Sequence, residues 1–176
     1  MKFETLTSIA ARLPRTNIDT DQIIPARFLK VTERAGVGAH LFADWRPELP
    51  QGAQIMIAGD NFGCGSSREH AVWALMDRGF RAVISTKFGD IFRQNALKNG
   101  LVPVVVDANV FAALLNTQPE TLFTIDLRSQ VLRAECLKPI AFEIDSFSRT
   151  CLLEDLDEIG YILAHEKQIA SFEATH

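Results

Sequence analysis

The stretch Gly59-Asp60-Asn61-Phe62-Gly63-Cys64-Gly65-Ser66-Ser67-Arg68-Glu69-His70-Ala71 decides the fold of this chain. It follows an apolar run at residues 55–58 and precedes a helical pattern at residues 72–76. The pattern predicts a strand, a glycine-rich turn and a helix whose first turn carries hydroxyl groups and a guanidinium. Such a turn leaves backbone N–H groups free at a helix N-terminus, and that arrangement favours a bound anion.

The serines of this turn have two interpretations. Ser66 and Glu69 fit a capping box, in which Ser66 is the N-cap and Glu69 reaches back to it. A cap explains neither Gly63 and Gly65 nor the cation of Arg68 in a first turn, where the helix dipole disfavours positive charge. A bound carboxylate or phosphate, gripped by the guanidinium, explains Arg68 better. The residues alone therefore indicate an anion-binding turn in which a serine either caps the helix or acts as a base.

Familiar glycine motifs do not fit the turn. A Walker A loop needs Lys before the hydroxyl residue, but Ser66 follows Gly65 directly. The dinucleotide fingerprint and the nucleophile elbow both need glycine where Arg68 stands. We therefore expect neither a nucleotide site nor an elbow-type hydrolase from this motif.

The composition is that of an ordinary globular protein. The chain has 176 residues, of which 47% are hydrophobic and 23% charged, so we expect one domain over residues 1–176. A net charge of −4 argues against a nucleic-acid partner, because phosphate binding needs clustered Lys and Arg. No apolar run is long enough to span a membrane and no signal peptide opens the chain, so we expect no membrane partner and a cytoplasmic location.

The cysteines are few and scattered. Cys64, Cys136 and Cys151 are odd in number and form no C-x-x-C pair. We expect no disulfide framework and no metal site made by this chain alone. Cys64 lies in the glycine turn, where it is either an incidental small residue or a nucleophile.

The middle of the chain alternates between strand and helix patterns, which predicts parallel pairing with right-handed crossovers. A hairpin, a further strand and an amphipathic closing helix follow. The result is a mixed α/β domain. In chain order, the ranges are a strand at 55–58, a helix at 67–78 closed by Gly79, a strand at 82–86, a helix at 90–99 closed by Gly100, a strand at 102–106, a helix at 108–116 capped by Asp107, hairpin strands at 122–127 and 131–135, a strand at 140–144, and a closing helix marked by Leu152, Leu156, Ile159 and Leu163.

Two earlier segments have no such pattern. Residues 17–25 place two carboxylates beside an apolar pair and end at Pro25, so we expect an extended N-terminal region. Residues 30–52 form a long loop without periodicity that contains several apolar and aromatic side chains. A loop of this length is usually functional, and we expect a mobile lid.

Residues 61–71 resemble the signature of the aconitase-type swivelling domains and, within that superfamily, of the 3-isopropylmalate dehydratase small subunits. The resemblance spans nearly the whole chain. It is carried by five motifs, at residues 17–30, 40–46, 61–71, 88–95 and 152–159.

The resemblance implies a fold, a reaction and a partner. The fold class is α/β, a swivelling β/β/α domain with a mixed sheet and flanking helices. The reaction is that of a hydro-lyase of leucine biosynthesis, which isomerises 2-isopropylmalate and 3-isopropylmalate by dehydration and rehydration. This chain would bind no cofactor. The partner is a large subunit that carries a [4Fe–4S] cluster, in a heterodimer or heterotetramer, and the chain is expected to be active only with it.

The resemblance also assigns roles to residues. Ser66, as an alkoxide, would take the carbon-bound proton, while Ser67 and Arg68 hold a substrate carboxylate and stabilise the base. Asp21 would support the site. Lys30 and Arg34 lie in the loop that reads the substrate, although each is also explained as a solvated charge.

Alternatives stay open at this stage. This chain lacks a second basic residue near Lys30 and is short between Arg46 and Ile55, so a citramalate or another methylmalate-type acid is an alternative substrate. A non-catalytic anion-binding domain and an independent hydrolase using Ser66 or Cys64 are alternatives from other classes. We interpret three further residues as follows: His70 as a structural hydrogen-bonding residue, His40 as a partner contact or a loop residue, and Asp19 as a residue that orders its own turn.

Overall fold

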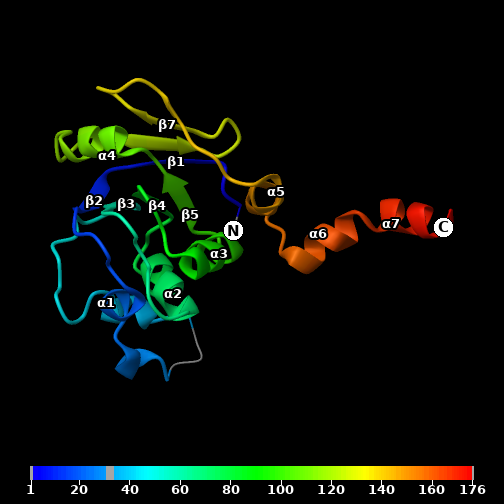
Figure 1. The fold of residues 1–176 in the computed structure, drawn as a ribbon, viewed down its shortest axis with the longest axis horizontal. Helices are drawn as coiled ribbons and strands as arrows, with labels where there is room; N and C mark the ends of the chain where they lie inside the picture. Colours follow the sequence, from blue (N-terminus) through cyan, green and yellow to red (C-terminus); the bar gives the residue numbers. More distant parts are fainter. Residues whose placement is uncertain (1, 31–33, 176) are drawn as a thin grey trace.

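The computed structural model describes residues 2–30 and 34–175, which include two four-stranded β-sheets (Figure 1). One sheet is parallel throughout, and its strands follow one another in chain order. Its strands are almost entirely buried, as expected for a parallel sheet covered on both faces. They are β2 (Ala10–Leu13), β3 (Ile55–Ala58), β4 (Ala82–Ser85) and β5 (Val102–Val105).

Two helices connect the last three parallel strands. α2 (Glu69–Asp77) joins β3 to β4, and α3 (Asp90–Asn99) joins β4 to β5. The predicted bounds of α3 are confirmed, including its end at Gly100 in the left-handed conformation. α2 starts two residues later than predicted. Within the described part of the chain, no helix is long and apolar enough to cross a membrane.

The second sheet is antiparallel, with the order β1-β6-β7-β8. The predicted hairpin is confirmed, and its turn is held by the Asp126 carboxylate, which accepts the N–H groups of Arg128 and Ser129 at 2.9 and 3.0 Å. The last predicted strand is shorter than expected. The strands are β1 (Thr5–Ser8), β6 (Phe123–Asp126), β7 (Val131–Ala134) and β8 (Ile140–Ala141), and α4 (Ala108–Leu115) precedes β6 with Asp107 as its N-cap, as predicted.

The layers follow from the alternation of side chains along the parallel strands. In β3, Met56 and Ala58 enter a core shared with α2 and α3, whereas Ile55 and Ile57 enter a core shared with the antiparallel sheet. The parallel sheet therefore lies between helices on one face and the second sheet on the other (Figure 1). This β/β/α arrangement confirms the predicted fold class, with the parallel and antiparallel pairings in separate sheets.

The prediction of an extended segment at residues 17–25 is wrong in part, because α1 (Thr20–Ile23) forms one helical turn within it. Asp19 caps this turn in a capping box with Gln22. The turn ends at Ile24, whose backbone is extended, as expected before Pro25.

The loop predicted as a lid at residues 30–52 is partly packed on the body of the protein. Residues 31–33 lie outside the described residues, and two short 3₁₀ helices, η1 (Ala26–Phe28) and η2 (Val37–His40), flank them. Phe42 is fully buried, and its N–H donates to Ile23 O at 2.8 Å. The Asp77 carboxylate of α2 accepts the N–H of Gly38 at 2.8 Å. The later part of the loop is thus anchored, and mobility of the loop stays a prediction.

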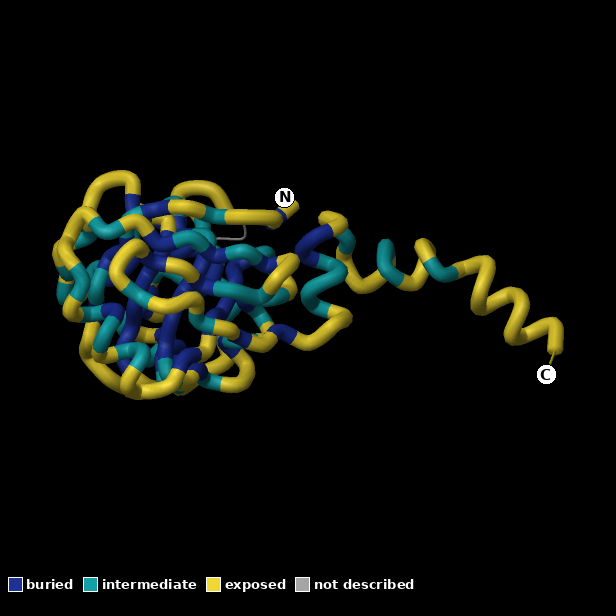
Figure 2. The backbone as a smooth tube through the Cα atoms, turned by 90° about the horizontal axis from the view of Figure 1, so that it is seen from above, coloured by how far each residue is buried: buried dark blue, intermediate teal, exposed yellow. Residues whose placement is uncertain are grey.

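The prediction of a single closing helix is wrong, because the chain forms three helices there. These are α5 (Ser146–Glu154), α6 (Glu158–Ala164) and α7 (Glu166–Glu173). Asp155 takes the left-handed conformation and ends α5, and Asp157 then caps α6. Of the residues that marked the expected helix, Leu152 is buried, but Ile159 and Leu163 are exposed. The segment after α5 projects from the body (Figure 2).

Candidate active site

The glycine turn lies between β3 and α2, after the carboxyl end of a parallel strand, where ligands collect in open α/β sheets. Gly63 and Gly65 both have positive φ, at +73° and +86°. A Cβ on Gly63 would lie 2.2 Å from Cγ of Phe92 in α3, and one on Gly65 would lie 3.4 Å from Cβ of Asp19. Gly63 is therefore required both by its backbone conformation and by the close approach of α3.

The turn is hydrogen-bonded to the N-terminal segment. The N–H of Gly63 donates to Ile18 O at 2.7 Å, and the N–H of Thr20 donates to Cys64 O at 3.0 Å. The buried hydroxyl of Thr20 donates to Ser66 O at 2.9 Å. Two motifs far apart in the sequence thus form one structural unit.

The capping box predicted at Ser66 and Glu69 is wrong. The N-cap of α2 is Arg68, and its side chain makes no capping hydrogen bond. The Glu69 carboxylate instead accepts a hydrogen bond from Nδ2 of Asn99 in α3 at 2.7 Å, so it is directed away from Ser66. Ser66 and its neighbour Ser67 are exposed residues ahead of the helix.

Arg68 and Asp21 form an ion pair between Nη1 and Oδ1. The side chain of Arg68 is only 15% exposed and that of Asp21 is 55% exposed. The hydrogen bond from Arg68 lowers the pKa of Asp21, and the same bond raises the pKa of Arg68. Asp21 also accepts the N–H of Ala26 at 3.1 Å. The structure thus brings together two of the three predicted catalytic residues, and the Thr20 hydrogen bond ties the third, Ser66, to the same helical turn.

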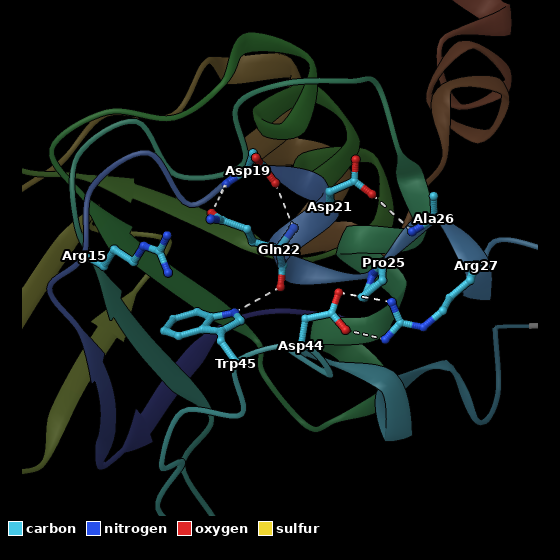
Figure 3. Close-up of a pocket in the computed structure, with 9 residues that line it drawn as sticks. All are labelled: Arg15, Asp19, Asp21, Gln22, Pro25, Ala26, Arg27, Asp44 and Trp45. Atoms are coloured by element: carbon cyan, nitrogen blue, oxygen red, sulfur yellow. Dashed lines mark hydrogen bonds and ion pairs between the residues drawn. The ribbon is translucent and has the colours of Figure 1, made fainter.

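A cavity of about 460 Å³ opens beside Asp21 on the side of α1 (Figure 3). The guanidinium of Arg27 pairs there with the carboxylate of Asp44, with Nη1 donating to Oδ2 at 3.1 Å. The indole N–H of Trp45 donates to Gln22 O at 3.1 Å. The lining side chains are both acidic and basic, and they are Arg15, Asp19, Asp21, Gln22, Pro25, Ala26, Arg27, Asp44 and Trp45.

Arg27, Asp44 and Gln22 were not predicted as site residues from the sequence. Each lies within a motif that carries the family resemblance, and that position was the available signal. The ion pair between Arg27 and Asp44 was not predictable, because 16 residues separate the two in the sequence.

The two predicted substrate-reading residues lie apart from this cavity. Lys30 is exposed, and neither Lys30 nor Arg34 lines the cavity. The guanidinium carbon of Arg34 lies 5.2 Å from the ring centre of Trp73, a cation–π distance. Arg34 therefore packs against α2, whose N-cap is Arg68. The substrate-binding roles of Lys30 and Arg34 stay predictions.

The other singled-out residues have structural contacts. Burial, and then the Asp19 carboxylate, raise the pKa of the Cys64 thiol, which is the opposite of what a thiolate nucleophile needs. The ring centre of His70 lies 4.5 Å from that of Trp73, with the two planes tilted by 47°. The ring of His40 stacks on Phe28, with centres 3.9 Å apart. Asp19 orders its turn, as interpreted from the sequence.

Comparisons with known proteins identify similar chains. Residues 48–109 match the family described as Aconitase C-terminal domain. The chain is 51% identical to the 3-isopropylmalate dehydratase small subunit of Solibacter usitatus, over 99% of this chain and 94% of that protein. It is 54% identical to the small subunit of the same name from Anaeromyxobacter sp. strain K, over 92% of this chain and 91% of that protein.

A solved structure is also similar. The crystal structure of 3-isopropylmalate dehydratase from Methanocaldococcus jannaschii is 29% identical, with a TM-score of 0.73. That match covers 96% of this chain and 99% of the other. The similarity therefore extends over both sheets and not only over the glycine turn.

Proposed function

The chain belongs to the family of 3-isopropylmalate dehydratase small subunits, and we propose that it supplies one half of the active site of such an enzyme. The enzyme is a hydro-lyase that interconverts 2-isopropylmalate and 3-isopropylmalate by dehydration and rehydration, in leucine biosynthesis. The observation that carries the proposal is the exposed Ser66–Ser67 turn, held against the Arg68–Asp21 ion pair by the Thr20 hydrogen bond.

Ser66 is the base that takes the carbon-bound proton. A serine hydroxyl is a very weak acid, so the alkoxide needs donors and positive charge nearby. Arg68 supplies the charge two residues away, and the turn leads into the N-terminus of α2, where the helix dipole favours an anion. Ser66 is exposed in this chain, and a partner that excludes water would strengthen each of these interactions.

Arg68 and Ser67 hold a carboxylate of the substrate. A guanidinium carries five N–H donors in a fixed plane, so the bond from Nη1 to Asp21 leaves further donors for a carboxylate. Asp21 fixes the plane of that guanidinium and so acts as a positioning residue. Lys30 and Arg34 remain candidates for recognition of the rest of the substrate.

The cofactor belongs to the larger subunit. Cys64, Cys136 and Cys151 are free thiols, and among the described residues no three His, Cys, Asp or Glu side chains are grouped to hold a metal ion. The described residues thus offer no set of thiolates that fits an iron–sulfur cluster. We assign a [4Fe–4S] cluster to the larger subunit, where it would act as the Lewis acid for the leaving hydroxyl. The two subunits form a heterodimer or heterotetramer in the cytoplasm. Residues 1–176 of this chain make up the single swivelling domain of the small subunit.

The test is reconstitution under anaerobic conditions. The chain is purified with and without the large subunit of the same organism, and the alkene intermediate is followed by its absorbance with 2-isopropylmalate and with citramalate as substrates. We expect turnover of 2-isopropylmalate only by the pair, and loss of that turnover with Ser66→Ala. Turnover by the chain alone, or full activity of the variant pair, would contradict the proposal.

A further inference from the structure

The last two helices form an arm with almost no contact with the body. We call residues 155–175 the C-terminal arm. Within it no residue is buried, and Figures 1 and 2 show it extending away from both sheets. The rings of Tyr161 and Phe147 of α5 form a T-shaped pair with centres 4.8 Å apart, so the base of the arm contacts the body.

The arm exposes large apolar side chains at helical spacing. The exposed fractions are 67% for Ile159, 57% for Ile162, 63% for Leu163 and 42% for Ile169. Ile159, Ile162 and Leu163 lie at positions i, i+3 and i+4 of α6 and so share one side of that helix. Ile169 is a further exposed apolar residue, in α7. Monomeric proteins rarely leave contiguous apolar patches of more than a few hundred Å² exposed. Short isolated helices such as α6 and α7 are also only marginally stable in water, so a partner surface would stabilise them.

The charge of the arm restricts what can cover it. Its acidic residues outnumber its single lysine, Lys167, by four, which equals the whole net charge of −4 of the chain. The rest of the chain therefore has balanced charge. Two arms packed against each other would repel, and a near-neutral body offers an acidic helix little attraction. The acidic residues are Asp155, Asp157, Glu158, Glu166 and Glu173.

We propose that the C-terminal arm docks on the larger subunit, in an apolar groove with a basic rim. The inference rests on the proposed function, since a small subunit requires a larger one. The apolar side of the arm would enter the groove, and its carboxylates would meet Lys and Arg side chains at the edge. The arm would thereby hold the two halves of the active site together without contacting the substrate.

The experiment compares two variants of the full chain that add the same charge. Leu163→Asp places a carboxylate on the apolar side, whereas Gln168→Asp places one at an exposed polar position of α7. The dissociation constant for the purified large subunit is measured by interferometry at two ionic strengths, and turnover is measured over a range of large-subunit concentrations. The isolated variants are checked by circular dichroism and by sedimentation.

We expect Leu163→Asp to weaken binding at least tenfold and Gln168→Asp to change it less than twofold. We also expect the Leu163→Asp pair to regain the wild-type kcat once the large subunit is saturating, and wild-type binding to weaken as ionic strength rises. Equal affinities for the two variants would overturn the inference. Conversion of a dimer of this chain into a monomer by Leu163→Asp, with unchanged affinity for the large subunit, would overturn it in favour of a second copy as the occupant.

The outcomes separate this inference from the proposed function. A wild-type pair that binds but does not turn over isopropylmalate contradicts the proposed function, whatever the arm does. A wild-type pair that is active, with the same affinity for Leu163→Asp, contradicts the arm alone.

Discussion

The hydroxyl of Thr20 donates a hydrogen bond to the main-chain carbonyl of Ser66, 2.9 Å away and 46 residues along the chain. Thr20 belongs to the helical turn that carries Asp21, and Ser66 belongs to the glycine turn that leads to Arg68. One partly buried hydrogen bond therefore fixes the spacing between the proposed base and the ion pair beside it.

We predict that Thr20→Val lowers kcat of the reconstituted pair, because Ser66 loses its anchor while the side chain keeps its shape. The lost hydrogen bond should also lower the free energy of unfolding of the chain by about 1 kcal/mol. Thr20→Ser keeps the hydroxyl and should retain most of kcat. Urea unfolding and steady-state turnover of both variants provide the measurement, and equal kcat values for the two would contradict the prediction.

Ser66→Ala and Ser67→Ala should change different kinetic constants of the reconstituted pair. We expect Ser66→Ala to reduce kcat by roughly 10²- to 10⁴-fold, the usual contribution of a general base, and Ser67→Ala mainly to raise KM. Because neither serine caps α2, both variants should keep the wild-type midpoint of thermal unfolding. A clear drop in that midpoint for Ser66→Ala would return the serine to a capping role.

Cys64 should be dispensable. Its thiol is partly buried and its pKa is raised, so Cys64→Ser should retain most of the activity of the pair. Alkylation by iodoacetamide should modify the exposed Cys136 faster than Cys64, as mass spectrometry of tryptic peptides can determine. Rapid alkylation of Cys64 with loss of activity would instead support a nucleophilic thiol.

The alternating middle of the chain was predictable because each element there has its own local signal. The apolar run at Ile55–Ala58, the Asp107 cap and the terminating Gly100 each mark a boundary without help from the rest of the protein. The closing helix was not predictable from periodicity. Its apolar spacing continues through residue 155, and only the left-handed conformation of Asp155 breaks it.

The site was partly predictable for a similar reason. The patterns Ser66-x-x-Glu69 and Asp19-x-x-Gln22 both fit a capping box, and the sequence cannot choose between them. The choice depends on Asn99, a residue of another helix, which binds the carboxylate of Glu69. The pairing of Asp21 with Arg68 likewise depends on tertiary contacts. The family resemblance assigned both residues to the site but did not predict that they form an ion pair.

The ion pair of Asp21 predicts a dependence of stability on pH. Arg68 lowers the pKa of Asp21 in the folded chain below its unfolded value of about 3.9. The stabilisation is therefore fully present above pH about 4 and is lost as pH falls through the folded pKa. Because Asp21 is more than half exposed, the stabilisation by the ion pair should be at most about 1 kcal/mol.

Urea unfolding should show Asp21→Asn less stable than the wild type at pH 7 and pH 5, with a smaller difference near pH 3. A difference that stays constant to pH 3 would contradict the assignment.

Gly63 and Gly52 form a matched pair for testing how tightly the glycine turn is packed. Both have positive φ, +73° and +79°, so alanine is strained at either position by roughly 1 kcal/mol. A Cβ at Gly52 meets no heavy atom within 4 Å, whereas one at Gly63 would lie 2.2 Å from Cγ of Phe92. We expect Gly52→Ala to lower the free energy of unfolding by about 1 kcal/mol, and Gly63→Ala to add an overpacking cost of about 1–3 kcal/mol. Gly63→Ala should also reduce turnover of the pair, because relief of the overlap must move either α3 or the turn that carries Ser66. If the two variants unfold at the same urea concentration, the turn is more adaptable than its contacts with Phe92 indicate.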